Sequence, residues 1–184
     1  MGVGQGAEGH GAGRHVRATG TADARPSRWC EAIRDGELWN LPVTLVPHPH
    51  DVHRFVDDAL AARSAGTQLA YATIDLATRR IAGSTRFTAI NLPNRRLEIG
   101  FTFLGRTWQR TAVNTEAKLL MLTHAFEALG MNRVEFLTDV RNSASRAAIS
   151  RLGATHEGSC GAMLRTCGSV PGRHAEGVPS RMIP

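Results

Sequence analysis

The segment from 96 to 153 constrains the fold of this chain more strongly than any other stretch. Apolar residues occupy every second position over 96–104, which is the pattern of a half-buried strand. An apolar stretch over about 113–129 predicts a buried helix that ends at Gly130, and Val134–Thr138 predicts a second strand. Because parallel strands require a crossover of this length, the order predicts a strand–helix–strand unit.

The length of the chain and the composition of its ends indicate one domain with two tails. The 184 residues, 42% of them hydrophobic, suffice for one sizeable core but not for two. Residues 1–26 are rich in glycine and arginine, and residues 162–184 show neither strand nor helix periodicity. We therefore expect a folded domain over 27–161, a disordered N-terminal tail and an irregular C-terminal tail.

Local signals add further elements before the strand at 96–104. We expect helices over 27–34 and 51–65 and strands over 70–74 and 81–90, with a hairpin connection between these strands. Ser27 and Asp51 are suited to cap the two helices. Within the strand at 96–104, strict alternation places four apolar side chains on one face: Leu97, Ile99, Phe101 and Phe103.

Composition and charge argue against several classes of partner. Lys and Arg number 22 and Asp and Glu 16, which gives a net charge of +6, but only 5% of residues are aromatic and no basic run contains them. We expect no nucleic-acid partner. No apolar run approaches the roughly 18 residues that a membrane span needs, so we expect no membrane association. Three cysteines without metal-type spacing favour free thiols in a cytoplasmic protein.

A histidine cluster is the nearest approach to a metal motif. His48, His50 and His53 lie close together in the sequence. Pro49 and the helix cap expected at Asp51 should direct these side chains differently, so we predict no metal site.

An ordered series of short motifs resembles a known family. The motifs are Leu97-Glu98-Ile99-Gly100-Phe101, Asn114-Thr115-Glu116-Ala117-Lys118, His124-Ala125-Phe126-Glu127, Asn132-Arg133-Val134-Glu135, Asn142-Ser143-Ala144-Ser145-Arg146 and Arg151-Leu152-Gly153-Ala154. Over about residues 29–158 they resemble GNAT N-acetyltransferases of the RimJ/RimL type. The resemblance implies an α/β protein with the GNAT fold, a mixed central sheet with splayed strands flanked by helices. It also implies acetyl-CoA-dependent transfer of an acetyl group to a primary amine, on a protein N-terminus or a small molecule.

The resemblance assigns the pyrophosphate of acetyl-CoA to the loop that opens the long helix: Gln109, Arg110, Thr111, Ala112, Val113, Asn114 and Thr115. Backbone N–H groups and the positive end of a helix dipole favour an anion there. The family's loop is typically Q/R-x-x-G-x-G/A, and Ala112 and Asn114 depart from it. If residue 112 required a positive φ or a very close approach of the backbone to the cofactor, Ala112 would weaken cofactor binding. The same residues also fit a plain helix cap.

Other cofactor contacts are implied only by the resemblance. In this family the strand at 96–104 splays from its parallel neighbour, so that backbone groups near Phe103 and Leu104 bind the pantetheine arm. Asn142 is the implied partner of the pantetheine amides. As a residue, Asn142 is equally suited to cap the helix that follows.

Glu98 and Ser145 are the implied catalytic residues. The amine must lose a proton, and Glu98 occupies the family position of a base that acts through water. Ser145 matches the serine that donates to the leaving thiolate. From the residues alone, Glu98 also fits a solvated strand carboxylate and Ser145 a first-turn helix residue. Trp39 lies where this family builds its acceptor cleft, and it also fits a core position.

The two ends depart from the family. Members usually open with a strand and finish with a strand beside the one after Gly153, but neither 13–25 nor 163–184 shows alternation. We therefore expect both terminal strands to be missing. Two functions stay open: an active acetyltransferase, favoured by Glu98, Asn142 and Ser145, and a catalytically silent GNAT-like domain that binds coenzyme A or a protein partner. Both a monomer and a homodimer fit the sequence.

Overall fold

The computed structural model describes residues 16–20, 26–160 and 165–171. These residues form one seven-stranded sheet in the order β1-β2-β3-β4-β5-β7-β6. Neighbouring strands are antiparallel except for β4 and β5, which are parallel. The strands are β1 (Val16–Gly20), β2 (Leu69–Asp75), β3 (Ile81–Asn91), β4 (Arg96–Leu104), β5 (Arg133–Asp139), β6 (Thr155–Cys160) and β7 (Arg165–Pro171).

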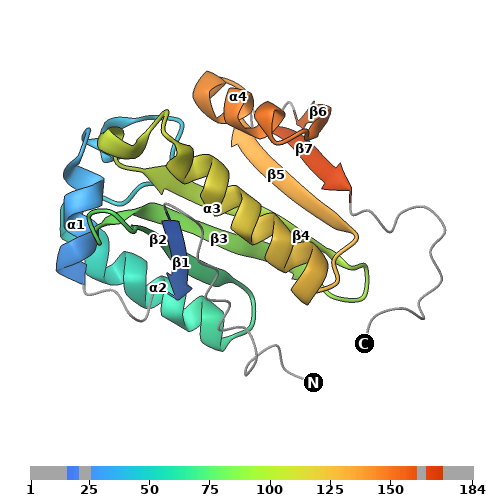
Figure 1. The fold of residues 1–184 in the computed structure, drawn as a ribbon, viewed down its shortest axis with the longest axis horizontal. Coiled ribbons are helices and arrows are strands. Elements are labelled where there is room, and N and C mark those ends of the chain that lie inside the picture. Colours follow the sequence, from blue (N-terminus) through green and yellow to red (C-terminus); the bar gives the residue numbers. More distant parts are fainter. Residues whose placement is uncertain (1–15, 21–25, 161–164, 172–184) are drawn as a thin grey trace.

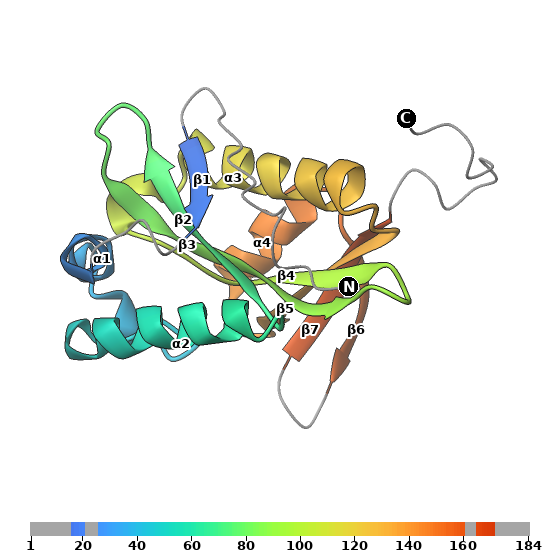
Figure 2. The ribbon, with the colours of Figure 1, turned by 90° about the horizontal axis from the view of Figure 1, so that it is seen from below.

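Helices cover both faces of the sheet (Figures 1 and 2). On one face lie α1 (Pro26–Arg34) and α2 (Val52–Ser64), and on the other lie α3 (Ala112–Thr123) and α4 (Ser143–Arg151). A π-helix (His124–Ala128) extends α3. Short 3-10 helices occupy Leu38–Asn40, Pro49–Asp51 and Arg106–Trp108.

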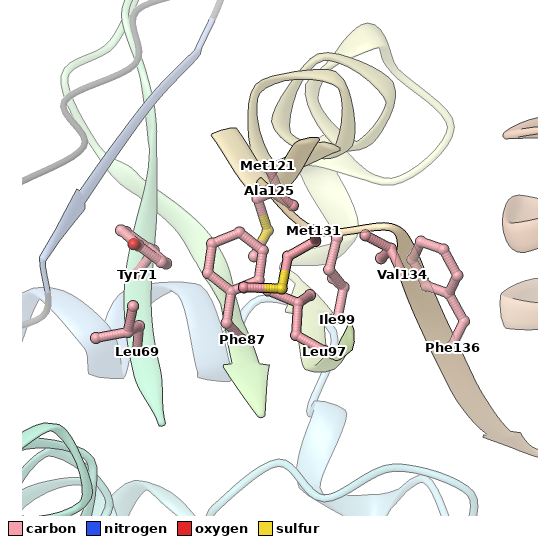
Figure 3. Close-up of a cluster of buried hydrophobic side chains, with 10 residues drawn as sticks. All are labelled: Leu69, Tyr71, Phe87, Leu97, Ile99, Met121, Ala125, Met131, Val134 and Phe136. Carbon is pink, nitrogen blue, oxygen red and sulfur yellow. The ribbon is translucent and has the colours of Figure 1, made fainter. Parts of the chain in front are cut away.

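Each face of the sheet has its own hydrophobic core. Figure 3 shows the core between the sheet and α3, in which strand residues from β2 to β5 meet Met121 of α3, Ala125 of the π-helix and Met131 after it. On the opposite face, Trp29 of α1 is fully buried and packs with Phe55 of α2 and Phe103 of β4. The sheet is therefore buried on both sides where its central strands lie.

The structure confirms the strand–helix–strand unit and the two N-terminal helices. The strand over 96–104 has the predicted bounds, and Gly130 has φ +62°, as expected of a residue that ends a helix. The expected helix caps differ. The first helix begins at Pro26, a favoured residue for a first turn, and Asp51 makes no side-chain capping bond because a 3-10 turn precedes the second helix.

The predicted strict alternation of β4 is wrong at Phe101. Two residues of β4, Phe101 and Thr102, lie opposite Thr85 of β3, so β4 has a bulge there. Phe101 has φ +51° and its side chain is 40% exposed. Beyond the bulge the alternation is inverted: Ile99 packs beneath α3, whereas Phe103 packs on the opposite face. Alternation in a sequence cannot reveal an inserted residue of this kind.

The expectation that the terminal strands are missing is also wrong. All five residues of β1 pair with β2, and Val16 is fully buried with its amide bonded to Glu116 Oε2 at 2.8 Å. The closing strand β7 pairs with β5 on one side and β6 on the other. Backbone hydrogen bonds to the neighbouring strands hold β1 and β7 in the sheet. These bonds form whether or not apolar and polar side chains alternate. The remaining parts of the two predicted tails lie outside the described residues.

Candidate active site

The parallel strands β4 and β5 form a fork. Their ladder covers three residue pairs, Arg96 with Arg133, Leu97 with Val134 and Glu98 with Glu135. Beyond these pairs β4 continues to Leu104 and β5 to Asp139 without further paired positions between the two strands. Figure 1 shows them starting side by side and separating toward the end where α4 lies. This is the splay that the family resemblance implied.

A helix N-terminus follows the carboxyl end of β4. Thr111 caps α3, because its side chain accepts a hydrogen bond from the Val113 amide at 3.3 Å and donates one to the Trp108 carbonyl at 2.7 Å. The Gln109 side-chain amide donates to the Leu104 carbonyl at 2.9 Å, so Gln109 holds the end of β4 in place. The Val113 side chain is buried in the core.

Ala112 carries no backbone strain. It is the first residue of α3 and is exposed, whereas the residue of this loop with positive φ is Arg110, at +60°. Residue 112 therefore does not need the positive φ that would favour glycine, whereas the effect of its side chain on a close approach of the cofactor stays a prediction. Asn114 and Thr115 lie in the first turn of α3, and the amide of Asn114 is among the first N–H groups that have no acceptor within the helix.

A second helix N-terminus follows the carboxyl end of β5. The Asn142 side chain caps α4 by accepting from the Ser145 amide at 3.0 Å, which confirms the capping interpretation of this residue. Its amide nitrogen also approaches the Val43 carbonyl at 3.4 Å. Asn142 thus connects α4 to the loop over 41–47, and Ser145 lies half-buried in the first turn.

Glu98 lies at the point where the fork opens, because it belongs to the last residue pair between β4 and β5. Its carboxylate lies over Gly100, and a Cβ on Gly100 would stand 2.7 Å from Glu98 Oε1. Glu98 is half-buried on the face that carries α1 and α2. This position suits a group that must reach a substrate between the two strands.

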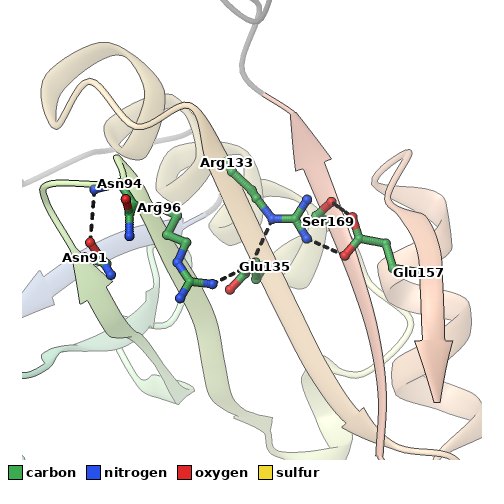
Figure 4. Close-up of polar contacts among 7 residues, drawn as sticks. All are labelled: Asn91, Asn94, Arg96, Arg133, Glu135, Glu157 and Ser169. Atoms are coloured by element: carbon green, nitrogen blue, oxygen red, sulfur yellow. Dashed lines mark hydrogen bonds and ion pairs between the residues drawn. The ribbon is translucent and has the colours of Figure 1, made fainter. Parts of the chain in front are cut away.

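The neighbouring carboxylate of Glu135 forms ion pairs with two arginines. Glu135 Oε1 accepts from Arg96 at 3.3 Å and from Arg133 Nε at 2.8 Å, and Arg133 continues to Glu157 on β6 (Figure 4). The hydrogen bonds that Arg133 donates, first to Glu157 and then to Glu135, raise the pKa of Arg133, while the bonds that Glu157 accepts from Arg133 and Ser169 lower the pKa of Glu157. This charged ladder crosses the closed end of the fork and engages the Glu135 carboxylate.

A family model for the acetyltransferase (GNAT) domain matches residues 16–155. The chain belongs to the GNAT acetyltransferase family. The match includes β1, β4, α3 and the fork, so the GNAT domain accounts for both helix N-termini at the site.

One curated relative matches part of the GNAT chain. It is a Bacillus subtilis (strain 168) protein, YdaF, whose name classes it as a ribosomal N-acetyltransferase, and it is 37% identical over 65 residues. Those residues are 35% of this chain and 35% of the relative, so the match spans about a third of the relative's length.

Solved structures of GNAT proteins share the fold more widely. A GCN5-related N-acetyltransferase from Brucella melitensis has a TM-score of 0.76 at 26% identity, over 87% of this chain and 77% of that chain. An acetyltransferase from Salmonella typhimurium that modifies the N-terminal serine of ribosomal protein L7/L12 has a TM-score of 0.77 at 16% identity, over 88% and 98%. The second likeness shows the fold alone.

The structure places the remaining predicted residues at the edge of this GNAT site or away from it. Trp39 is half-buried and packs against the core beneath α1 and α2. Its ring makes an edge contact with the His48 ring, with 5.3 Å between the ring centroids. In the described ranges no three His, Cys, Asp or Glu side chains are grouped to hold a metal. Nor do these ranges contain a helix long and apolar enough to span a membrane.

Sequence reasoning missed three side chains around the β4 bulge. Arg86 of β3 is 5% exposed, and its guanidinium stacks between the rings of Phe55 and Phe101. The Cζ atom lies 4.6 Å from the centroid of the first ring and 4.9 Å from that of the second. On the other face, Lys118 of α3 binds Thr102. A single lysine within an apolar helix was the one available signal, since Lys118 is the only lysine in the chain.

Proposed function

We propose that this chain is an acetyl-CoA-dependent N-acetyltransferase that transfers an acetyl group to a primary amine. The observation that carries this proposal is the fork between β4 and β5, with a helix N-terminus following each strand. Ligands of open α/β sheets bind in crevices beyond the carboxyl ends of such strands. The cytoplasmic location and the monomeric or homodimeric state expected above stay predictions.

The residues that would hold acetyl-CoA lie along this fork. The backbone over 109–115 offers first-turn amides and the positive end of the α3 dipole to the pyrophosphate. The edge of β4 near Phe103 and Leu104 would bind the pantetheine arm, because β5 does not pair with that edge. Asn142, at the far side of the fork, would contribute its remaining N–H donor.

The proposed chemistry divides between β4 and α4. Bound acetyl-CoA supplies an activated acyl group with a thiolate as leaving group. Glu98 would accept the proton that the attacking amine loses, through a water molecule, and Ser145 would donate a hydrogen bond to the departing sulfur. Glu98 is the proposed base because it belongs to the last paired position before the fork opens, whereas the Glu135 carboxylate accepts from two arginines.

The acceptor would enter beside the loop over 41–47. This loop contacts Asn142 and exposes two apolar side chains, Leu41 at 43% and Leu45 at 70%. Trp39 precedes it and is the proposed substrate contact from the core side. A protein N-terminus with apolar residues suits this wall better than a highly charged small amine, and the name of the Bacillus subtilis relative favours the same class.

Calorimetry and mass spectrometry test this function directly. We expect acetyl-CoA to bind the wild-type protein, and peptides with free N-termini to gain one acetyl group above a control without enzyme. No heat at millimolar acetyl-CoA would contradict the proposal. Binding without transfer to any peptide or small amine would instead identify a catalytically silent coenzyme A-binding domain.

Replacement of Gly100 by alanine should slow acetyl transfer while leaving the fold intact. The new Cβ would stand 2.7 Å from Glu98 Oε1, and the flexible carboxylate can move away whereas the strand cannot. We expect kcat to fall about tenfold, since a displaced base loses part of its contribution. The control is Gly100→Ala combined with Glu98→Gln, which should be no slower than Glu98→Gln alone. A wild-type rate in Gly100→Ala would contradict the assigned position of the base.

A further inference from the structure

Lys118 is a buried basic residue of α3 that bonds to two threonines. Its side chain lies on α3 and is 5% exposed, and its Nζ donates to Thr85 at 2.8 Å and to Thr102 at 2.6 Å. The two threonine hydroxyls lie 2.9 Å apart and complete a triangle. No ion pair with Lys118 occurs among the described residues. Burial lowers the pKa of this amine to about 7.

The triangle lies at the bulge of β4. Thr102 belongs to the pair of residues that faces Thr85, and its neighbour Phe101 has a left-handed φ of +51°, which an aromatic residue adopts only when its surroundings impose it. The bulge turns Phe103 to the opposite face, and it falls within the part of β4 that no longer pairs with β5. The course of β4 through the fork therefore depends on this bulge.

Contacts from both faces of the sheet hold the bulge. On the face of α1 and α2, the Arg86 guanidinium stacks on Phe101. On the face of α3, Lys118 bonds to the bulged strand at Thr102 and to its neighbour at Thr85. The second of these two contacts connects the bulge to α3, the helix whose N-terminus is proposed above to receive the pyrophosphate.

We propose that Lys118 is a positioning residue for the pantetheine arm of acetyl-CoA. Through Thr102 it fixes the bulge, so that the unpaired edge of β4 keeps a constant place relative to the phosphate-binding end of α3. This inference rests on the proposed function. Lys118 is not proposed to contact the acyl group or the acceptor amine, because it is buried between α3 and the sheet and its own amine is bonded to two threonines.

Two ligands separate arm binding from phosphate binding. Acetyl-CoA uses both regions, whereas 3′-phosphoadenosine 5′-phosphate carries phosphates but no pantetheine arm. The variants are Lys118→Met, which keeps length without donors, and Thr102→Val, which keeps shape without a hydroxyl. The matched controls are Thr102→Ser, which keeps the hydroxyl, and Leu119→Ala, which changes a neighbouring side chain of α3 that is 61% exposed.

We expect Lys118→Met and Thr102→Val to raise KM for acetyl-CoA about tenfold, as the loss of hydrogen bonds at one position predicts, and to lower kcat as well. Binding of the nucleotide should stay at the wild-type level, and Thr102→Ser and Leu119→Ala should behave as wild type. Unchanged acetyl-CoA kinetics, or equal weakening of both ligands, would overturn the positioning role. If wild-type protein bound neither ligand, the proposed function itself would fail, and this inference with it.

Discussion

Replacing Glu98 by glutamine is expected to lower kcat for acetyl transfer at neutral pH about a hundredfold. Glutamine has the shape of glutamate but cannot accept the proton that the amine loses. The residue occupies the opening of the fork without carrying any of the assigned contacts to acetyl-CoA. Calorimetry should therefore report a wild-type affinity for acetyl-CoA, while the rise of the rate toward alkaline pH should flatten.

Glu135→Gln is the matched control for this experiment. Glu135 is the cross-strand neighbour of Glu98, and two arginines already bind its carboxylate. We expect this variant to keep a rate close to that of the wild type. A wild-type rate in Glu98→Gln, or an equal loss in both variants, would show that Glu98 is not the base.

The sequence predicted the central part of the fold because periodic signals there are strong and local. Alternation gave the bounds of β4, and a long apolar stretch ending at Gly130 gave the helix that follows it. The family resemblance supplied the splay of β4 from β5, which no residue pattern could indicate. How far two parallel strands stay paired depends on the register of the whole sheet.

The failures of prediction concern features decided by distant contacts. The bulge at Phe101 depends on Arg86 and Thr85 of the neighbouring strand and on Lys118 of a helix. The strands β1 and β7 are specified more by their ladders with β2, β5 and β6 than by their own side chains. Local propensity carries no information on such partners.

The candidate site was predictable only in part for the same reason. Glu98 and Asn142 could be identified because family motifs mark them, and the structure places them at the fork and at the N-terminus of α4. The positive φ considered for Ala112 followed from motif comparison, and the backbone instead has its left-handed residue at Arg110. The role of Glu135 required knowledge of which arginines lie across the strands.

The unfolding free energy should rise between pH 7 and pH 9 because of Lys118. Burial lowers its folded-state pKa from 10.5 to about 7, so in this range the unfolded chain binds the proton and the folded protein does not. Stability increases with pH wherever the unfolded state binds more protons, here by up to about 1.4 kcal/mol per pH unit. The total gain from pH 7 to pH 9 should be on the order of 2 kcal/mol.

The other titratable groups on the same face do not produce this slope. Burial raises the pKa of Tyr71 on β2 above its ordinary value and lowers that of His124, which follows α3. On Asp75 burial raises the carboxyl pKa, but hydrogen bonds from Thr78, Trp108 and the backbone outweigh it and lower the pKa overall. Glu116 is bonded to the Val16 amide. Among these groups only the amine of Lys118 is placed to change its charge between pH 7 and pH 9.

Urea denaturation of wild type and Lys118→Met at a series of pH values measures the effect. Thiols and the terminal amine are common to both proteins, so the difference between the two profiles isolates Lys118. We expect the wild-type midpoint to rise with pH relative to that of the variant, at unchanged m-value. Parallel profiles would show that Lys118 keeps an ordinary pKa in the folded protein, and the amine would then be charged beneath the β4 bulge. A rise of the unfolding free energy with pH would therefore indicate that the Lys118 amine bonded to Thr85 and Thr102 is uncharged in the folded protein.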